Sequence, residues 1–468
     1  MMGQLLESWD VSHEKLTWHI RPGVYWAPNE EQSAWMEARE LTADDVIADL
    51  LCLREAPGGK SFKKFSGEIY ATDRYTLVIE FDYFDSEWFY IIGYEDRAFI
   101  SPPEMITAGA SEWENQVGTG PFIFKEYVEG SYMSFSRNPN WWKTTTINGV
   151  EYPLPFIDEL VIPIVPDEST RIAVLRTGTV DAYASVLPPY WSTLEQTAPG
   201  LLSASHLGEG RTLAFRCNQP PFNDIDLRRA LMVGTDLKGF GDLQGAGRLP
   251  IHFYPTSEVN PTIYTPLEEL PAETRLLFDY NPTLAMAMLA DAGYAGGLEL
   301  TCNIGTSAEH QDIGALLKDQ WDKIGVTVNL NTVEQAAFDA MGRAVTYDDT
   351  IVGKFDIANP YFGLYKRARS RPLGIFNQAD WSNERFDELM DVVAASTEPA
   401  DQSVAYKEAA VILINEVPYI PLTLCPRRHY WWPWVKNYYG EWNVQDNPSP
   451  YPFAFAWIDQ NLKEEMGY

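Results

Sequence analysis

The sequence predicts an α/β protein that folds into about three compact units. Its 468 residues exceed what a single hydrophobic core usually organises, and 45% of them are hydrophobic, so each unit can bury a core. Up to about residue 155, short alternating stretches are separated by turns, which is typical of a mostly β region. From residue 282 onward, strand-length and helix-length patterns alternate, and this predicts βα units around a parallel sheet.

The first part opens with two expected strands that pair with each other, Leu6–Trp9 and Leu16–Ile20. Alternate residues of the second strand are apolar, so one of its faces should be buried. Thr42 followed by Asp45 has the spacing of a capping box and predicts that a helix begins there. Tyr75–Phe81 alternates again and is the next expected strand.

The stretch Gly118–Phe122 is a Gly/Pro turn, and it leads into two alternating segments that end at Asn138-Pro139. This pattern predicts an antiparallel hairpin. We expect Gly118 and Gly120 to adopt a positive φ or to lie close to other backbone, because glycine tolerates both. A structural turn and a functional turn both remain open.

From residue 157 the sequence predicts a series of strands and helices. Strands are expected at 157–164, from 180, and at 213–218, 298–304, 326–332 and 418–424; helices are expected at 169–176, 226–233, 282–292, 309–324, 384–395 and 403–415. The strand, helix and strand of 298–332 form a crossover unit. Arg228 and Arg229 should lie on the outer face of their helix, and 239–275 should be loop.

The charge balance excludes several classes of function. The formal net charge is −31, whereas nucleic acids and anionic bilayers are bound through Lys and Arg. No apolar segment of 18 residues is present to span a membrane. The four cysteines, at positions 52, 217, 302 and 425, form no C-x-x-C pair, and the six histidines are scattered, so no metal or cofactor is predicted. Isolated thiols are the simplest interpretation, and one disulfide remains open.

Nine motifs occur in an order that resembles the bacterial extracellular solute-binding protein family 5, the dipeptide- and oligopeptide-binding receptors of ABC importers. They include the strand pair with Ile20-Arg21-Pro22-Gly23-Val24, the helix start Leu41–Val46, Gly118–Phe122 with Arg137–Trp142, Leu175–Asp181, Pro221-Phe222 with Leu227–Leu231, Tyr280–Pro282 with Leu289–Tyr294, Ile324–Val326, and Val417–Leu422. Family members carry a signal peptide and further strands before the first motif. The resemblance therefore implies an N-terminally truncated copy.

The resemblance implies a two-lobed periplasmic-binding-protein-like fold of class II (cluster C type), with an extra, mostly β subdomain on lobe I. Residues 1–155 would form the extra subdomain, 156–235 with 433–468 the core of lobe I, and 236–432 lobe II. A peptide would be captured between lobes that close by hinge motion. The implied partner is an ABC permease, and the protein would be a monomer in the periplasm, outside the cell or lipid-anchored at its surface.

The family places an aspartate against the amine of a peptide ligand, in a pattern similar to G-W-x-x-D-x-x-x-P. Asp356 and Pro360 keep the D-x-x-x-P spacing here. Lys354 occupies the usual position of the tryptophan, and Gly353 lies one residue nearer to the aspartate. Because a neighbouring cation can pair with the carboxylate, Asp356 has two interpretations, a ligand contact and an ordinary loop residue.

Other candidates for ligand contacts are aromatic or polar. Trp26, Trp381 and the segment Trp431–Trp434 could stack on sugar rings or peptide side chains, although most tryptophans are core residues. Gly118, Thr119 and Gly120 would offer backbone groups near the cleft of the family fold, and Asn218 ends a strand near the expected crossing between lobes. These candidates complete the predicted ligand site.

No catalytic residue is predicted. The sequence lacks G-x-S-x-G, H-E-x-x-H, G-x-x-x-x-G-K-[ST] and G-x-G-x-x-G motifs. Two alternatives to a peptide receptor stay open: an oligosaccharide receptor of the same family, and a secreted carbohydrate-active enzyme or sugar-binding module, which the acidic, Trp-rich composition would suit.

Overall fold

A computed structural model describes the chain except for residues 1–3, 30, 32, 34, 87, 95–98, 207–209, 244–253, 257–259, 356–359, 425, 442, 445–446 and 449–450. The chain divides into two compact units. Unit 1 contains Met1–Ser205 and Arg428–Tyr468, and unit 2 contains His206–Arg427. From the sequence, these changes were expected after residue 235 and before residue 433. The difference arises because the strand and helix between residues 210 and 233 join the sheet and helices of unit 2.

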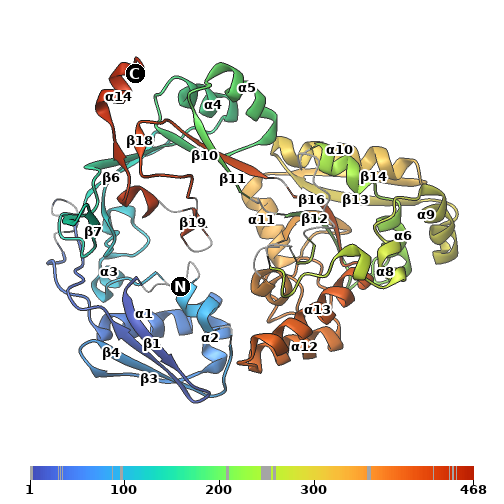
Figure 1. Ribbon diagram of the computed structural model, residues 1–468. Helices are drawn as coiled ribbons and strands as arrows, with labels where there is room; N and C mark the ends of the chain where they lie inside the picture. The colour runs from blue at the N-terminus through green and yellow to red at the C-terminus, as the bar shows by residue number, and fades with distance from the viewer. Residues whose placement is uncertain are drawn as a thin grey trace. The chain divides into compact units, whose positions relative to one another are not determined.

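Unit 1 begins with a four-stranded antiparallel sheet in the order β1-β2-β4-β3. Its strands are β1 (Leu6–Val11), β2 (Lys15–Ile20), β3 (Ser66–Asp73) and β4 (Thr76–Phe81). The predicted pairing of β1 with β2 is confirmed, and Leu16, Trp18 and Ile20 are buried as their alternation requires. Helix α1 (Ala43–Glu55) begins at the predicted Thr42 capping box and packs on β3 and β4 (Figure 1).

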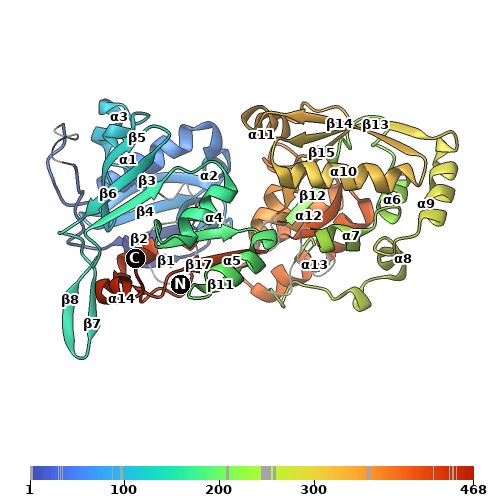
Figure 2. The same cartoon turned by 90° about the horizontal axis from the view of Figure 1, so that it is seen from above.

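Two further helices, α2 (Lys60–Phe65) and α3 (Pro103–Ala108), pack on α1. The predicted hairpin consists of β5 (Phe122–Val128) and β6 (Tyr132–Arg137), and β9 (Glu159–Pro163) adds a third strand to it. A separate hairpin, β7 (Thr144–Ile147) with β8 (Val150–Pro153), extends away from the rest of unit 1 in Figure 2.

The core of the remaining part of unit 1 combines segments from both ends of the chain. Its sheet has the order β10-β17-β11. The strands are β10 (Ala182–Val186), β11 (Leu202–His206) and β17 (Arg427–Trp431). The helices of this part are α4 (Glu168–Arg176), α5 (Trp191–Thr197) and α14 (Gln460–Glu465). A short antiparallel pair is formed by β18 (Val435–Lys436) and β21 (Trp457–Ile458). Two-residue strands β19 (Asn443–Val444) and β20 (Asn447–Pro448) form another pair.

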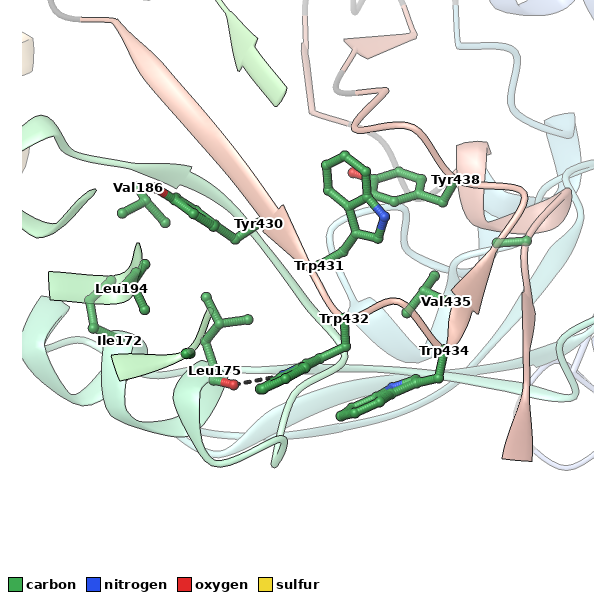
Figure 3. Packing of buried hydrophobic residues seen from close by; sticks show 12 residues of the cluster. Ile172, Leu175, Val186, Leu194, Tyr430, Trp431, Trp432, Trp434, Val435 and Tyr438 are labelled. Carbon is green, nitrogen blue, oxygen red and sulfur yellow. Dashed lines mark hydrogen bonds between the residues drawn. The ribbon is translucent and has the colours of Figure 1, made fainter. Parts of the chain in front are cut away.

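The tryptophans of 431–434 are buried in this core (Figure 3). The rings of Trp432 and Trp434 stack with centroids 4.7 Å apart, and the indole N–H of Trp432 donates to the carbonyl oxygen of Leu175 at 2.8 Å. The expectation that this segment could stack on a ligand is therefore corrected, because its rings are used for packing within unit 1.

Unit 2 contains a five-stranded mixed sheet in the order β14-β13-β15-β12-β16. Strand β13 is parallel to β14 and β15, whereas β12 is antiparallel to β15 and β16. The bounds are β12 (Gly210–Phe215), β13 (Leu298–Gly305), β14 (Val326–Val333), β15 (Thr350–Phe355) and β16 (Tyr419–Leu424). The predicted strand, helix and strand of 298–332 are confirmed as β13, α10 and β14, with α10 packed on both strands (Figure 2).

The helices of unit 2 cover this sheet and pack in pairs, α6 on α9 and α12 on α13. They are α6 (Ile225–Val233), α7 (Leu237–Leu243), α8 (Ala272–Leu276), α9 (Pro282–Leu289), α10 (Ala308–Asp322), α11 (Gln335–Ala344), α12 (Glu384–Ala395) and α13 (Pro399–Glu416). Helices α7 and α8 correct the expectation that 239–275 is loop. Strand β15 and helix α11 were not predicted.

Arg228 corrects a second expectation, because it is 3% exposed and not on an outer face. Its guanidinium donates to the carbonyl oxygens of Phe222 at 2.7 Å and of Glu416 at 2.6 and 3.0 Å. Glu416 is the last residue of α13, whose final carbonyls have no partner within the helix. Arg228 therefore caps the C-terminus of α13 from the side.

Candidate functional site

The candidate site lies at one edge of the unit 2 sheet. Since β13, β14 and β15 are parallel, their carboxyl ends meet at this edge. Strand β12 begins there, because Gly210 pairs with Phe355 on one side and with Leu424 on the other. Ligands of open α/β sheets bind outside the carboxyl ends of such strands. We call this the carboxyl edge.

Helix α10 brings polar side chains to the carboxyl edge directly after β13. Ser307 caps the helix by accepting from the backbone N–H of His310, a typical N-cap arrangement. The Nδ1 atom of His310 accepts from the N–H of Gly305 at 2.9 Å. Burial, and then the positive charge of Arg211, lower the pKa of His310 to about 4. His310 is therefore neutral near pH 7 and carries its proton on Nε2.

Glu309, in the first turn of α10, joins two arginines at this edge. Its carboxylate accepts from Arg211 Nε at 3.0 Å and Nη2 at 2.8 Å, which is a bidentate pair. Arg427 Nη2 lies 3.8 Å from the same carboxylate. Burial alone would raise the pKa of Glu309, but Arg211 outweighs this effect and the pKa lies below its usual value. The carboxylate therefore stays ionised.

Lys354 adds a third cation to the carboxyl edge. It is an exposed residue of β15 and pairs in register with Arg211 of β12, so the two side chains leave the sheet on the same face. Arg211, Lys354 and Arg427 thus bring three cations to this edge, beside the carboxylates of Glu309 and Asp339, whose charges both act on His310. In a chain of net charge −31, such a group of cations is suited to attract an anionic group.

Two of the three predicted ligand residues of unit 2, Asn218 and Trp381, can be placed in the structure. Asp356 lies outside the described residues. Asn218 follows the other end of β12, at the edge opposite Phe355, and its side-chain amide donates to Asp380 Oδ2 at 2.6 Å. Trp381, next to Asp380, is 4% exposed and packs against Phe386. Asn218 and Trp381 are therefore neighbours, but at the edge away from the end of β15.

The predicted residues of unit 1 do lie together. Residues Trp26 and Ala27 run beside the turn, because the N–H of Ala27 donates to the carbonyl of Gly118 at 3.0 Å. Thr119 is half-buried between the two glycines, and the Gly120 carbonyl accepts from the side chain of Asn138 at 2.9 Å. Trp26 is fully buried, and its indole N–H faces Asp45 at 3.5 Å. Their roles as ligand contacts remain predictions.

The glycines of this turn correct the expectation of a positive φ, although Gly118 does lie beside other backbone through its bridge with Ala27. Neither Gly118 nor Gly120 has a positive φ, and a Cβ atom at Gly118 would come no nearer than 3.9 Å to another backbone atom. A Cβ atom at Gly120 would meet open space. The turn is instead held by the buried Asn138, which was predicted only as part of an Asn-Pro turn.

Arg211, Glu309 and Arg427 were not predicted as members of a site. Arg211 precedes the predicted strand, and Glu309 begins a predicted amphipathic helix, so both matched ordinary solvent-facing charges. No pattern in the sequence joins these residues, because they are far apart in the chain and meet only once the sheet has formed. Among the described residues, no group of three or more His, Cys, Asp or Glu side chains could hold a metal ion, and no helix could cross a membrane.

Comparisons with known proteins identify a family. The family model described as bacterial extracellular solute-binding proteins, family 5 (middle part), matches residues 1–374. Heme-binding protein A of Haemophilus influenzae is 28% identical over 453 residues, which cover 89% of this chain and 78% of that protein. The dipeptide-binding protein of Escherichia coli is 24% identical over 447 residues, with 88% and 79% covered.

The fold is also that of solved two-lobed binding proteins. The ABC transporter-associated periplasmic binding protein DppA of Helicobacter pylori, in complex with the peptide STSA, superposes with a TM-score of 0.79 at 19% identity, covering 97% of this chain and 89% of that one. The predicted α/β, two-lobed fold is confirmed by this match.

Proposed function

This chain belongs to the bacterial extracellular solute-binding proteins of family 5, and we propose that it captures a peptide or peptide-like solute and delivers it to the permease of an ABC importer. The proposal places the protein, as a monomer, in the periplasm or outside the cell, free or lipid-anchored. Binding would occur between the lobes as they close by hinge motion, without chemical change of the solute. Asp356, Asn218, Trp26, Trp381 and the turn 118–120 remain candidate contacts.

The positive carboxyl edge of unit 2 carries this proposal. A free peptide has a carboxylate at its C-terminus, and Lys354 and Arg211 are suited to attract such a group. Arg211 is buried and Lys354 is exposed, so we assign the direct contact to Lys354. Asp356, two residues further along, would face the ligand amine at the other end of a short peptide.

Isothermal titration calorimetry tests both the ligand class and the role of Lys354. We expect saturable binding of a dipeptide, at least tenfold weaker binding of the same dipeptide with an amidated C-terminus, and a similar loss in Lys354→Met. Lys318→Met, an exposed lysine of α10, is the matched control and should bind like wild type. Equal affinities for free and amidated dipeptides would contradict the assignment of Lys354.

Two other ligand classes belong in the same titration. Hemin is included because one relative is named a heme-binding protein, and an oligosaccharide is included because the Trp-rich composition suits sugar rings. Binding of hemin or of the sugar, with no response to dipeptides, would overturn the peptide assignment and keep the receptor. Recovery of a cleaved oligosaccharide would replace the receptor by a carbohydrate-active enzyme.

A further inference from the structure

The chain crosses from one unit to the other twice. In each unit, the two strands that lead into these crossings are neighbours in the same sheet. It leaves unit 1 after β11 and enters unit 2 as β12; it returns from β16 into β17. In unit 1, β17 is the neighbour of β11, and in unit 2, β16 is the neighbour of β12. The first connection therefore enters unit 2 at the carboxyl edge, and the second leaves unit 2 at the same edge.

Glu309 contacts both passages at the point where they meet unit 2. Arg211 is the second residue of β12, and Arg427 is the last residue of unit 2 before the return. Glu309 holds Arg211 in the bidentate pair and lies 3.8 Å from Arg427. The helix that carries Glu309 packs on β13 and β14, away from either passage. One carboxylate thus ties both connections to the body of unit 2.

Burial makes this tie strong. The side chains of Arg211 and Glu309 are only 8% and 12% exposed, and that of Arg427 is 18% exposed. Burying a charge is costly unless it is paired, so loss of the carboxylate would remove the bidentate partner of Arg211 and the ion pair with Arg427.

We propose that Glu309 is a positioning residue that fixes the starts of both connections, so that unit 2 moves as one body up to Arg211 and Arg427. The significance for ligand capture rests on the proposed function, because hinge closure needs a rigid lobe on each side of the connections. The contact itself does not depend on any ligand.

Hydrogen–deuterium exchange of the unliganded protein tests this role. In Glu309→Gln, we expect exchange at least tenfold faster in residues 211–214 and 420–424, with residues 298–304 and 326–332 unchanged. Glu384→Gln is the matched control, because Glu384 is an exposed acid in the first turn of α12. It should leave exchange unchanged everywhere.

A second variant keeps the test decisive if Glu309→Gln folds poorly. Arg427→Met removes the more exposed arginine and should accelerate exchange about threefold in residues 420–424 alone. The double variant should add nothing at 420–424 beyond Glu309→Gln, because the two side chains act through one contact. The proposal would be overturned if both single variants left the exchange rates at 211–214 and 420–424 unchanged. It would also be overturned if exchange became faster evenly over the whole of unit 2. Failure of wild-type protein to bind dipeptides would affect only the proposed function.

Discussion

Replacing Arg228 by methionine gives the sharpest test of how unit 2 is held together. Methionine keeps most of the aliphatic stem but removes the guanidinium, so the apolar packing of α6 changes little. The lost group donates to Phe222 and Glu416, with a longer contact of 3.2 Å to the carbonyl of Val417. It also lies 3.5 Å from the Glu416 carboxylate.

The expected loss is about 3–5 kcal/mol. Each hydrogen bond from a charged donor contributes about 1.5–3 kcal/mol, and buried carbonyls that lose their donor add a desolvation penalty. The Glu416 side chain is partly exposed, so water can replace some of the lost hydrogen bonds there. The loss of folding free energy should therefore stay within the range for breaking a buried ionic contact, about 3–5 kcal/mol. For a unit of this size, that is roughly 6–20 °C in the melting temperature.

Calorimetry or urea unfolding followed by circular dichroism measures this change, with Arg229→Met as the control. Arg229 is the next residue of the same helix, and its side chain makes no hydrogen bond or ion pair within the described part of the chain. Its replacement should change stability by less than about 0.5 kcal/mol. Equal losses in the two variants would refute the capping role of Arg228.

Two further predictions concern unit 1. Asn138→Ala removes the hydrogen bonds to the Gly120 carbonyl and from the Asn140 N–H, so we expect a loss of about 1–3 kcal/mol in thermal unfolding; a similar loss in Asn140→Ala would argue against it. Burial raises the pKa of Asp49 to about 6, so wild-type stability should fall as the pH rises from about 4, its ordinary pKa, to 6. Asp49→Asn, which still accepts from the Ser101 N–H, should match wild type near pH 4 and be more stable at pH 7; a pH-independent difference would contradict this.

The local elements of the chain were predictable because their signals are short-range. Alternation in Leu16–Ile20 and the capping pair Thr42 and Asp45 each depend on residues within a few positions, and both elements formed as expected. Strand β15 was missed although all its residues except Lys354 are apolar or small. It is buried within a sheet, so it lacks the alternation of a half-exposed strand.

The sequence by itself determined the class of this protein: an acidic α/β chain whose ordered motifs resemble one family of solute receptors. Only the tertiary structure decided which charged residues act together. Arg211 and Glu309 are 98 residues apart, and Arg228 lies 188 residues from the helix end that it caps. Helical and strand periodicity cannot report such pairs, because it records which face of an element is apolar and not what that face meets. The carboxyl edge, with its paired arginine and exposed lysine, exists only once the strands have taken their order in the sheet.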